Sequence, residues 1–304
     1  VIHNLPVVSD IRRHWPGAAI DWCVEESFAA IPRLHPAVGR VLPVAIRRWR
    51  KRLFDGGTWG EMAAWRRSLR ERDYDAVLDT QGLLKSALIT AQALGPKSGY
   101  DAASAREPMA ARFYDRHFNV SRQLHAVHRN RELAAKALGY SVSGAPDYGV
   151  TAPAGAFDWL PCGKPYVVFL TATSRDDKLW PEANWVALGQ QLAAAGFIAV
   201  LPAGNVVERE RAARLAAVMP GAIAAPPMNL PALATLLSSA RAVVGVDTGL
   251  SHLAVALAVP TVALYTATDP GLTGVLGSGF HRNLGGARRI PPVSDVLDAL
   301  SPVI

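Results

Sequence analysis

Short apolar runs rich in β-branched residues alternate along this chain with longer segments of helical character. This alternation predicts βα units, and βα units assemble into parallel sheets with helices packed on their faces. The predicted strands are Ala19–Val24, Arg40–Val44, Ala76–Asp79, Val167–Leu170, Ile198–Leu201, Val243–Val246 and Thr261–Leu264. The expected fold class is therefore α/β with doubly wound sheets.

The stretch from Gly144 to Pro165 is rich in Gly, Ala and Pro and has no helical period, which predicts a linker. With 304 residues, half of them hydrophobic, the chain can form two domains of about 150 residues each. We expect domains at residues 1–150 and 151–304, with ligands bound at the carboxyl ends of the sheets. The chain opens at Val1 with a predicted helix followed by a strand. Since α/β domains normally begin with a strand, we expect a first strand and its loop to precede Val1.

The chain is basic, with a formal net charge of +7, and five of its cations fall between Arg47 and Arg52. A phosphorylated or carboxylated substrate, an anionic membrane and nucleic acid are all possible partners. Nucleic acid is the weakest of these interpretations, because neither an aromatic RNA platform nor a helix-turn-helix pattern accompanies the basic residues.

Two cysteines, Cys23 and Cys162, are too few for a disulfide framework or a metal cluster. Their surroundings predict packed cores, and a reducing compartment follows. The longest apolar stretch, Leu253–Tyr265, is interrupted by Pro260 and is too short for a transmembrane helix. We expect neither a signal peptide nor a membrane-spanning segment.

The sequence also lacks a G-x-G-x-x-G motif after a strand and a Walker A motif, so a conventional NAD or P-loop site is not supported.

The segment VVGVDTGLSH, Val243–His252, predicts a buried strand, a polar turn and a helix. Asp247 and Thr248 supply oxygen atoms, Gly249 permits a close backbone approach, and the amides at the helix start can bind an anion. The alternative is an ordinary helix cap, since Asp and Thr are common at that position.

Two other strand ends carry polar residues that suit a nucleotide. In Thr171–Lys178, TATSRDDK, the hydroxyls of Thr173 and Ser174 and the ammonium of Lys178 could grip a diphosphate. A solvated loop with an Arg–Asp pair is the alternative. Pro181 is predicted in the first turn of the next helix. Glu208 could accept ribose hydroxyls, or it could simply be an acidic residue at a helix start.

Five segments together carry a family resemblance. They are VVGVDTGLSH (243–252), TATSRDDKLWP (171–181), VLPVAIRRWRK (41–51), DTQGLLKS (79–86) and AREPMAARFY (105–114). Together they resemble the ADP-heptose:lipopolysaccharide heptosyltransferases of glycosyltransferase family 9, and most closely those of type I. The resemblance implies a GT-B fold, in which two Rossmann-like domains face each other across a central cleft. It also implies inverting transfer of L-glycero-D-manno-heptose from ADP-heptose to the first Kdo of Kdo2-lipid A.

The resemblance also implies roles for particular residues. The donor-binding set is Thr173, Ser174 and Lys178 at the diphosphate, Glu208 at the ribose, Met228 near the adenine, and Asp247, Thr248, Gly249 and His252 at the heptose and phosphates. Lys178 and Asp247 are the catalytic members. The acceptor-binding set is Arg47, Arg50, Arg106 and Arg129, which would face the Kdo carboxylates and lipid A phosphates. Neither a metal ion nor a further cofactor is expected, because Lys178 and the helix-start amides carry the charge of the leaving ADP.

Departures from the family pattern concern the base and one turn. The aspartate that acts as the family's general base would lie just upstream of Val1, and His3 and Asn4 would follow its loop. Asp10 is predicted to be a solvent-facing helix residue and Asp79 a cap at a strand end, so neither is a strong substitute. In Tyr265–Pro270, YTATDP, only part of the family's turn is matched, at Thr268 and Asp269.

The location that the resemblance implies is the cytoplasmic face of the Gram-negative inner membrane, with peripheral attachment. Two alternatives remain open. One is a related heptosyltransferase that acts on an already heptosylated core, although the basic run at Arg47–Arg52 favours the first transfer. The other is a non-catalytic protein that binds nucleotide sugar or lipopolysaccharide.

Overall fold

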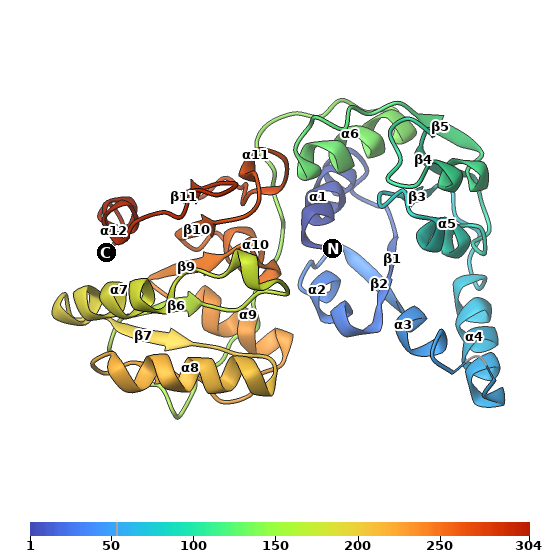
Figure 1. The fold of residues 1–304 in the computed structure, drawn as a ribbon. Helices are drawn as coiled ribbons and strands as arrows, with labels where there is room; N and C mark the ends of the chain where they lie inside the picture. Colours follow the sequence, from blue (N-terminus) through green and yellow to red (C-terminus); the bar gives the residue numbers. More distant parts are fainter. Residues whose placement is uncertain (53) are drawn as a thin grey trace. The chain divides into compact units, whose positions relative to one another are not determined.

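The structure is a computed structural model that describes residues 1–52 and 54–304 (Figure 1). The chain forms two compact units, His3–Gly144 and Ala145–Ile304, which we call the N-terminal and C-terminal units. Every pair of neighbouring strands within a named sheet is parallel. The predicted α/β class is therefore confirmed.

The N-terminal unit begins with a helix and then a strand, as predicted. Its helices are α1 Leu5–His14, α2 Ala30–Arg33, α3 Ile46–Trp49, α4 Gly56–Leu69, α5 Leu84–Thr90 and α6 Ala126–Leu138, and its 3-10 helices are η1 Ile2–Asn4, η2 Glu26–Phe28 and η3 Pro108–Phe113. Its strands are β1 Ile20–Glu25, β2 Val38–Val44, β3 Val77–Asp79, β4 Lys97–Tyr100 and β5 Arg116–Phe118. They form a two-stranded sheet, β1-β2, and a three-stranded sheet, β3-β4-β5.

Strands β4 and β5 were not predicted, because KSGY and RHF lack an apolar run. Tertiary packing decides them instead. A Cβ atom on Gly99 would lie 2.3 Å from the ring of Tyr114, so β4 needs a glycine where that ring crosses it.

The C-terminal unit is one six-stranded parallel sheet with helices around it (Figure 1). Its strands are β6 Tyr166–Leu170, β7 Ile198–Leu201, β8 Ile223–Ala224, β9 Ala242–Val246, β10 Thr261–Tyr265 and β11 His281–Gly285. Its helices are α7 Glu182–Ala194, α8 Val206–Val218, α9 Leu230–Ser238, α10 Gly249–Ala256, α11 Pro270–Thr273 and α12 Val293–Leu300, with η4 Asp176–Lys178 before α7. The sheet order is β11-β10-β9-β6-β7-β8. Read from the β8 edge and numbered within the unit, this is 3-2-1-4-5-6, the order of dinucleotide-binding folds.

Alternate residues of these strands enter opposite cores, as the two-residue period of a strand requires. One face packs Val167 and Val244 against α7, α8 and α12, around the fully buried Trp180 and Trp185. The other face packs Ala263 against Val255 of α10. Because both faces are covered, the central strands are apolar at nearly every position, which is why they were recognisable from the sequence.

Three expectations need correction. Pro181 is the N-cap residue of α7, one position before its first turn, because its ψ of 138° is extended. Cys162 is exposed rather than packed in a core. The predicted strands, by contrast, match to within one or two residues, and no helix or strand occurs between α6 and β6.

Asp10 is buried, so its prediction as a solvent-facing residue is wrong. Its carboxylate accepts two hydrogen bonds from the Arg131 guanidinium of α6, at 2.7 Å and 3.0 Å. The side chains are only 3% and 1% exposed. Arg131 also donates to the carbonyls of Ser143 and Gly144, at the end of the N-terminal unit. The pair therefore joins α1, α6 and the start of the linker.

Candidate active site

The candidate site lies where the sheet of the C-terminal unit reverses its strand order. Strands β6 and β9 are neighbours there, and the chain leaves them in opposite lateral directions. Loops after such a pair diverge, and the crevice between them is where open α/β sheets bind ligands. The loop after β6 contains Thr171–Lys178, and the loop after β9 contains Asp247 and Thr248. Both motifs singled out from the sequence therefore meet at this switch point.

A salt bridge joins the two loops. The ammonium of Lys178 donates to the Asp247 carboxylate at 2.7 Å, and the two side chains are 17% and 13% exposed. The same carboxylate oxygen accepts from the hydroxyl of Thr268, which follows β10, at 2.8 Å. The hydroxyl of Thr173 donates to the backbone carbonyl of Asp247 at 3.0 Å. One carboxylate thus organises the ends of three strands.

Asp247 does not serve as a helix cap. The N-cap of α10 is Thr248, which has extended backbone and no side-chain capping bond, and the helix begins at Gly249. The first amides of α10 therefore remain available to an anion, next to the Lys178 ammonium. A Cβ atom on Gly249 would meet no atom within 4 Å, so the backbone is open to a ligand at this point.

Close packing beneath the turn holds it in place. The hydroxyl of Ser251 donates to the carbonyl of Val246 at 2.8 Å. A Cβ atom on Gly245 would lie 2.4 Å from that hydroxyl oxygen, which explains the glycine within the strand. His252 is also buried at the start of α10.

Burial, and secondarily the Asp247 carboxylate, raises the pKa of Tyr265 well above its ordinary value. The phenol therefore stays neutral and adds no charge to the site.

Glu208 and Met228 lie further along the same edge of the sheet, after β7 and β8. The Glu208 carboxylate accepts from the backbone N–H of Gly204 at 2.8 Å and from the Asn205 amide at 2.7 Å. These are the contacts of an acidic residue at a helix start, as in the alternative prediction, and they also orient the carboxylate. Met228 is half-buried in the segment before α9. Ser174 is exposed beside Thr173.

The predicted acceptor-binding arginines belong to the N-terminal unit. Arg129 lies over the ring of Tyr100, 4.8 Å from its centroid, and donates to the carbonyl of Ser104 at 2.7 Å. Arg106 is exposed, and both Arg129 and Arg106 act electrostatically on Tyr100, although burial dominates and raises the pKa of Tyr100 to about 12. These two cations therefore share one neighbourhood.

Arg47 and Arg50 lie elsewhere in that unit, at α3, and both are exposed. Arg48 between them is held by Glu26 and Glu61. Asp79 is a cap at the end of β3, as predicted, because it accepts from the amides of Gln81 and Gly82. Its other oxygen accepts from the Tyr114 hydroxyl at 2.7 Å.

The structure thus brings Thr173, Lys178, Asp247 and Thr268 into direct contact and places the α10 amides beside them. Sequence reasoning assigned no role to Thr268 beyond its match to the family turn, and it did not consider Thr266. The Thr266 hydroxyl donates to the carbonyl of Asp177 at 2.8 Å and so holds the Lys178 loop against β10. The available signal was a pair of threonines directly after a predicted strand.

Comparisons with known proteins point to one family. Residues 62–288 match the sequence profile of glycosyltransferase family 9 (heptosyltransferase). The chain is 49% identical to lipopolysaccharide heptosyltransferase 1 of Pseudomonas aeruginosa over 91% of its own length and 78% of that protein's. It is 48% identical to lipopolysaccharide heptosyltransferase 1 of Salmonella typhimurium, over 91% and 88%.

Among solved structures, E. coli heptosyltransferase WaaC with ADP superposes with a TM-score of 0.91 at 42% identity, covering 100% of this chain and 96% of that one. WaaC with ADP-2-deoxy-2-fluoro heptose gives a TM-score of 0.86 at the same identity, covering 99% and 95%. These similarities confirm the predicted family and the predicted GT-B fold class.

Proposed function

Because the chain belongs to glycosyltransferase family 9, the heptosyltransferases, we propose that it transfers L-glycero-D-manno-heptose from ADP-heptose to the first Kdo of Kdo2-lipid A. The chain is a glycosyltransferase, and heptosyl transfer in lipopolysaccharide biosynthesis follows from its close relatives. The type I relatives support the first Kdo as the acceptor, and the WaaC complexes support ADP-heptose as the donor.

The observation that carries the proposal is the Lys178–Asp247 salt bridge at the switch point, next to the α10 amides. In a glycosyl transfer with inversion, the acceptor hydroxyl oxygen attacks the anomeric carbon from the side opposite ADP. The new C–O bond forms while the bond to the diphosphate breaks, and its electron pair leaves with ADP. Negative charge thus grows on the diphosphate oxygen, where an ammonium and helix-start amides stabilise it most effectively.

In this proposal Asp247 positions Lys178, and Thr268 and Thr173 position Asp247 and its backbone. Ser174, Thr248, Gly249 and His252 complete the contacts with phosphate and heptose, while Glu208 binds the ribose and Met228 lies near the adenine. A base must take the proton of the acceptor hydroxyl. Asp10 and Asp79 are buried and hydrogen-bonded, so we assign that role to neither of them.

Arg47, Arg50, Arg106 and Arg129 would receive the anionic acceptor. Of these, Arg129 is held by two contacts, because its guanidinium lies over the Tyr100 ring and donates to the Ser104 carbonyl. A preoriented guanidinium binds a carboxylate through two parallel hydrogen bonds at little entropic cost. In the described part of the chain, helices are too short or too polar to cross a bilayer. We propose peripheral attachment at the cytoplasmic face of the inner membrane because the proposed acceptor is a lipid.

The test is ADP release from ADP-heptose, with the product analysed by mass spectrometry. We expect turnover with Kdo2-lipid A and one added heptose per acceptor. Turnover only with an already heptosylated acceptor would assign the chain to a later transfer. Tight ADP binding without turnover on either acceptor would instead indicate a binding protein.

A further inference from the structure

The turn after β11 holds an arginine in a backbone conformation that arginine rarely adopts. Residues 286–289 form a β-turn that is closed by the Arg289 N–H, which donates to the carbonyl of Gly286 at 3.0 Å. Arg288 occupies the third position of this turn with a φ of 63°. A positive φ there is typical of a type II turn, in which glycine or asparagine is the usual residue. The chain therefore keeps an arginine at a conformational cost, and residues held in this way concentrate at functional sites.

Hydrogen bonds fix the turn against the candidate active site. The N–H of Gly286 donates to the carbonyl of Tyr265 at 2.8 Å, and the N–H of Arg288 donates to the carbonyl of Thr266 at 2.9 Å. The Thr266 hydroxyl in turn donates to the carbonyl of Asp177, in the loop after β6, at 2.8 Å. The turn after β11 is thus joined to the loops after β10 and β6.

The guanidinium of Arg288 is available to a ligand. Its side chain is exposed, and within the described part of the chain it has no partner for a hydrogen bond or an ion pair. Three carboxylates of the neighbouring loops have partners of their own, which are Lys178 for Asp247, Arg175 for Asp177 and the Gly271 amide for Asp269. What singles out Arg288 is therefore its unpaired guanidinium and not a local excess of positive charge.

The strand order places Arg288 beyond the sugar of the donor. In the proposed function the nucleoside lies after β8 and β7, the diphosphate after β6 and the heptose after β9. The sheet continues with β10 and β11, so the turn of Arg288 lies at the end of this edge that is away from the nucleoside. Since the acceptor hydroxyl attacks from the side opposite ADP, the molecule that approaches this end of the edge is the acceptor.

We propose that Arg288 binds a carboxylate of the acceptor, a sugar acid, beside the heptose and so helps to select an anionic acceptor. The planar guanidinium matches a carboxylate through two parallel hydrogen bonds. The C-terminal unit then contributes to acceptor binding as well as to donor binding. This assignment rests on the proposed function, because the order of the donor groups along the sheet is what gives this side to the acceptor.

The test variant is Arg288→Asn, because asparagine tolerates a positive φ and keeps the turn while the guanidinium is removed. KM for Kdo2-lipid A should rise about tenfold, as expected for the loss of a charged hydrogen-bonded pair at an exposed position. The kcat and the calorimetric affinity for ADP should stay at their wild-type values. Arg288→Lys keeps the charge without the planar fork and should recover part of the loss. Thermal unfolding should show that both variants are folded.

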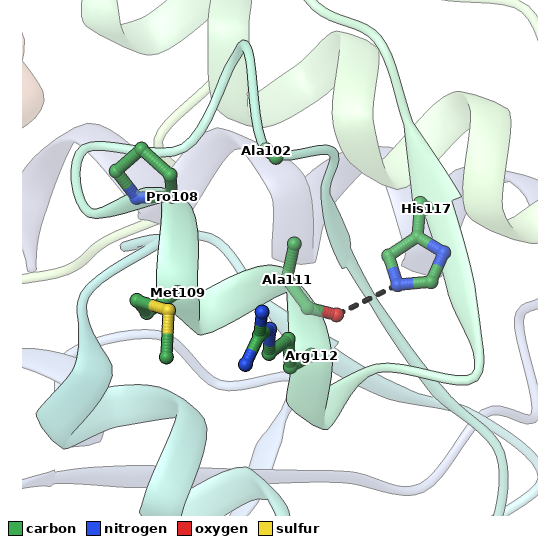
Figure 2. A pocket seen from close by; sticks show the side chains of 6 residues that line it. All are labelled: Ala102, Pro108, Met109, Ala111, Arg112 and His117. Atoms are coloured by element: carbon green, nitrogen blue, oxygen red, sulfur yellow. Dashed lines mark hydrogen bonds between the residues drawn. The ribbon is translucent and has the colours of Figure 1, made fainter.

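Two other exposed arginines serve as controls. Arg241→Asn removes a guanidinium directly before β9, at the opposite edge of the same sheet. Arg112→Asn removes a guanidinium beside a cavity of 490 Å³ in the N-terminal unit, shown in Figure 2, which is lined by Ala102, Pro108, Met109, Ala111, Arg112 and His117. Neither control should change KM for the acceptor.

Three results would each overturn the role of Arg288. They are an unchanged KM in Arg288→Asn, an equal rise of KM in either control, and a fall of kcat and ADP affinity at constant KM. The last of these would make Arg288 a structural support of the Lys178 loop.

Direct binding separates this assignment from the proposed function. Calorimetry with deacylated, water-soluble Kdo2-lipid A in the presence of ADP should show the same loss of about tenfold in affinity for Arg288→Asn. Turnover by wild type with undiminished acceptor affinity in the variant would refute the role of Arg288 and leave the proposed function standing. An inactive wild type whose acceptor affinity still depends on Arg288 would refute the proposed function and leave the anion site standing. A wild type that neither turns over nor binds the acceptor would refute both.

Discussion

Replacing Lys178 with alanine tests the chemistry assigned to the switch point. Its ammonium is 17% exposed and salt-bridged to Asp247 at 2.7 Å, so solvent screens it little. One such donor to a developing negative charge contributes about 2–4 kcal/mol to transition-state stabilisation. At 1.36 kcal/mol per tenfold change, kcat should fall by about 30-fold to about 1,000-fold.

The cost in stability should be smaller. Asp247 loses one charge-assisted hydrogen bond but keeps the Thr268 hydroxyl, so the free energy of unfolding should drop by about 1–3 kcal/mol. Circular dichroism would confirm that the variant is folded at the assay temperature. Lys164→Ala, which removes an exposed lysine from the same unit, is the matched control and should retain wild-type kcat.

The assay is the rate of ADP release with saturating ADP-heptose. A Lys178→Ala protein with wild-type kcat would show that the ammonium does not act on the leaving group. The companion change, Asp247→Asn, keeps the shape of the side chain but loses the charge that orients Lys178. It should weaken donor binding in calorimetry, with a loss of stability no larger than that of Lys178→Ala, because both variants remove the same salt bridge. A lower melting temperature with unaltered donor affinity would make Asp247 a purely structural residue.

Three further predictions concern the N-terminal unit and the two thiols. Arg47→Ala/Arg50→Ala should raise KM for the Kdo-containing acceptor, by a factor that shrinks with added salt, and should leave ADP affinity unchanged. The control Arg66→Ala/Arg67→Ala removes the same charge from exposed positions of α4. An equal rise in KM in the control, or a loss of ADP affinity in Arg47→Ala/Arg50→Ala, would contradict the assignment. Asp10→Ala should lower the free energy of unfolding of the N-terminal unit by about 3–5 kcal/mol in urea titrations, because the buried Arg131 loses its counter-charge. Arg13→Ala removes a 44% exposed partner of the same carboxylate and should lower the free energy of unfolding by about 1 kcal/mol or less. Equal losses in the two variants would refute the buried-pair argument. A thiol reagent at pH 8 should label only the exposed Cys162 in the native protein and both cysteines in denaturant, because burial raises the pKa of Cys23 to about 12. Rapid labelling of Cys23 in the native protein would be inconsistent with that burial.

The correspondence between sequence and structure is closest in the C-terminal unit. Every residue of strands β6, β9 and β10 is buried, so nearly every position carries an apolar residue, and such a run can be recognised from the sequence alone. The short strands β4 and β5 carry no such signal. KSGY is a strand because it pairs with β3 and β5, and Gly99 leaves room for the ring of Tyr114, a residue fifteen positions away.

The sequence by itself determined the alternating α/β class, the central strands and the polar loops that follow β6 and β9, because each depends on neighbours along the chain. Only the tertiary structure decided which side chains meet. Lys178 and Asp247 are 69 positions apart in the sequence, yet the ammonium nitrogen and a carboxylate oxygen lie 2.7 Å apart, because parallel strands bring their carboxyl ends to one edge of the sheet. The 121 positions between Asp10 and Arg131 likewise become a buried salt bridge, which reverses the exposure predicted for Asp10. A helical period shows which side of α1 is apolar, but whether an acidic residue on that helix is exposed depends on what packs against it, and here that is an arginine of α6.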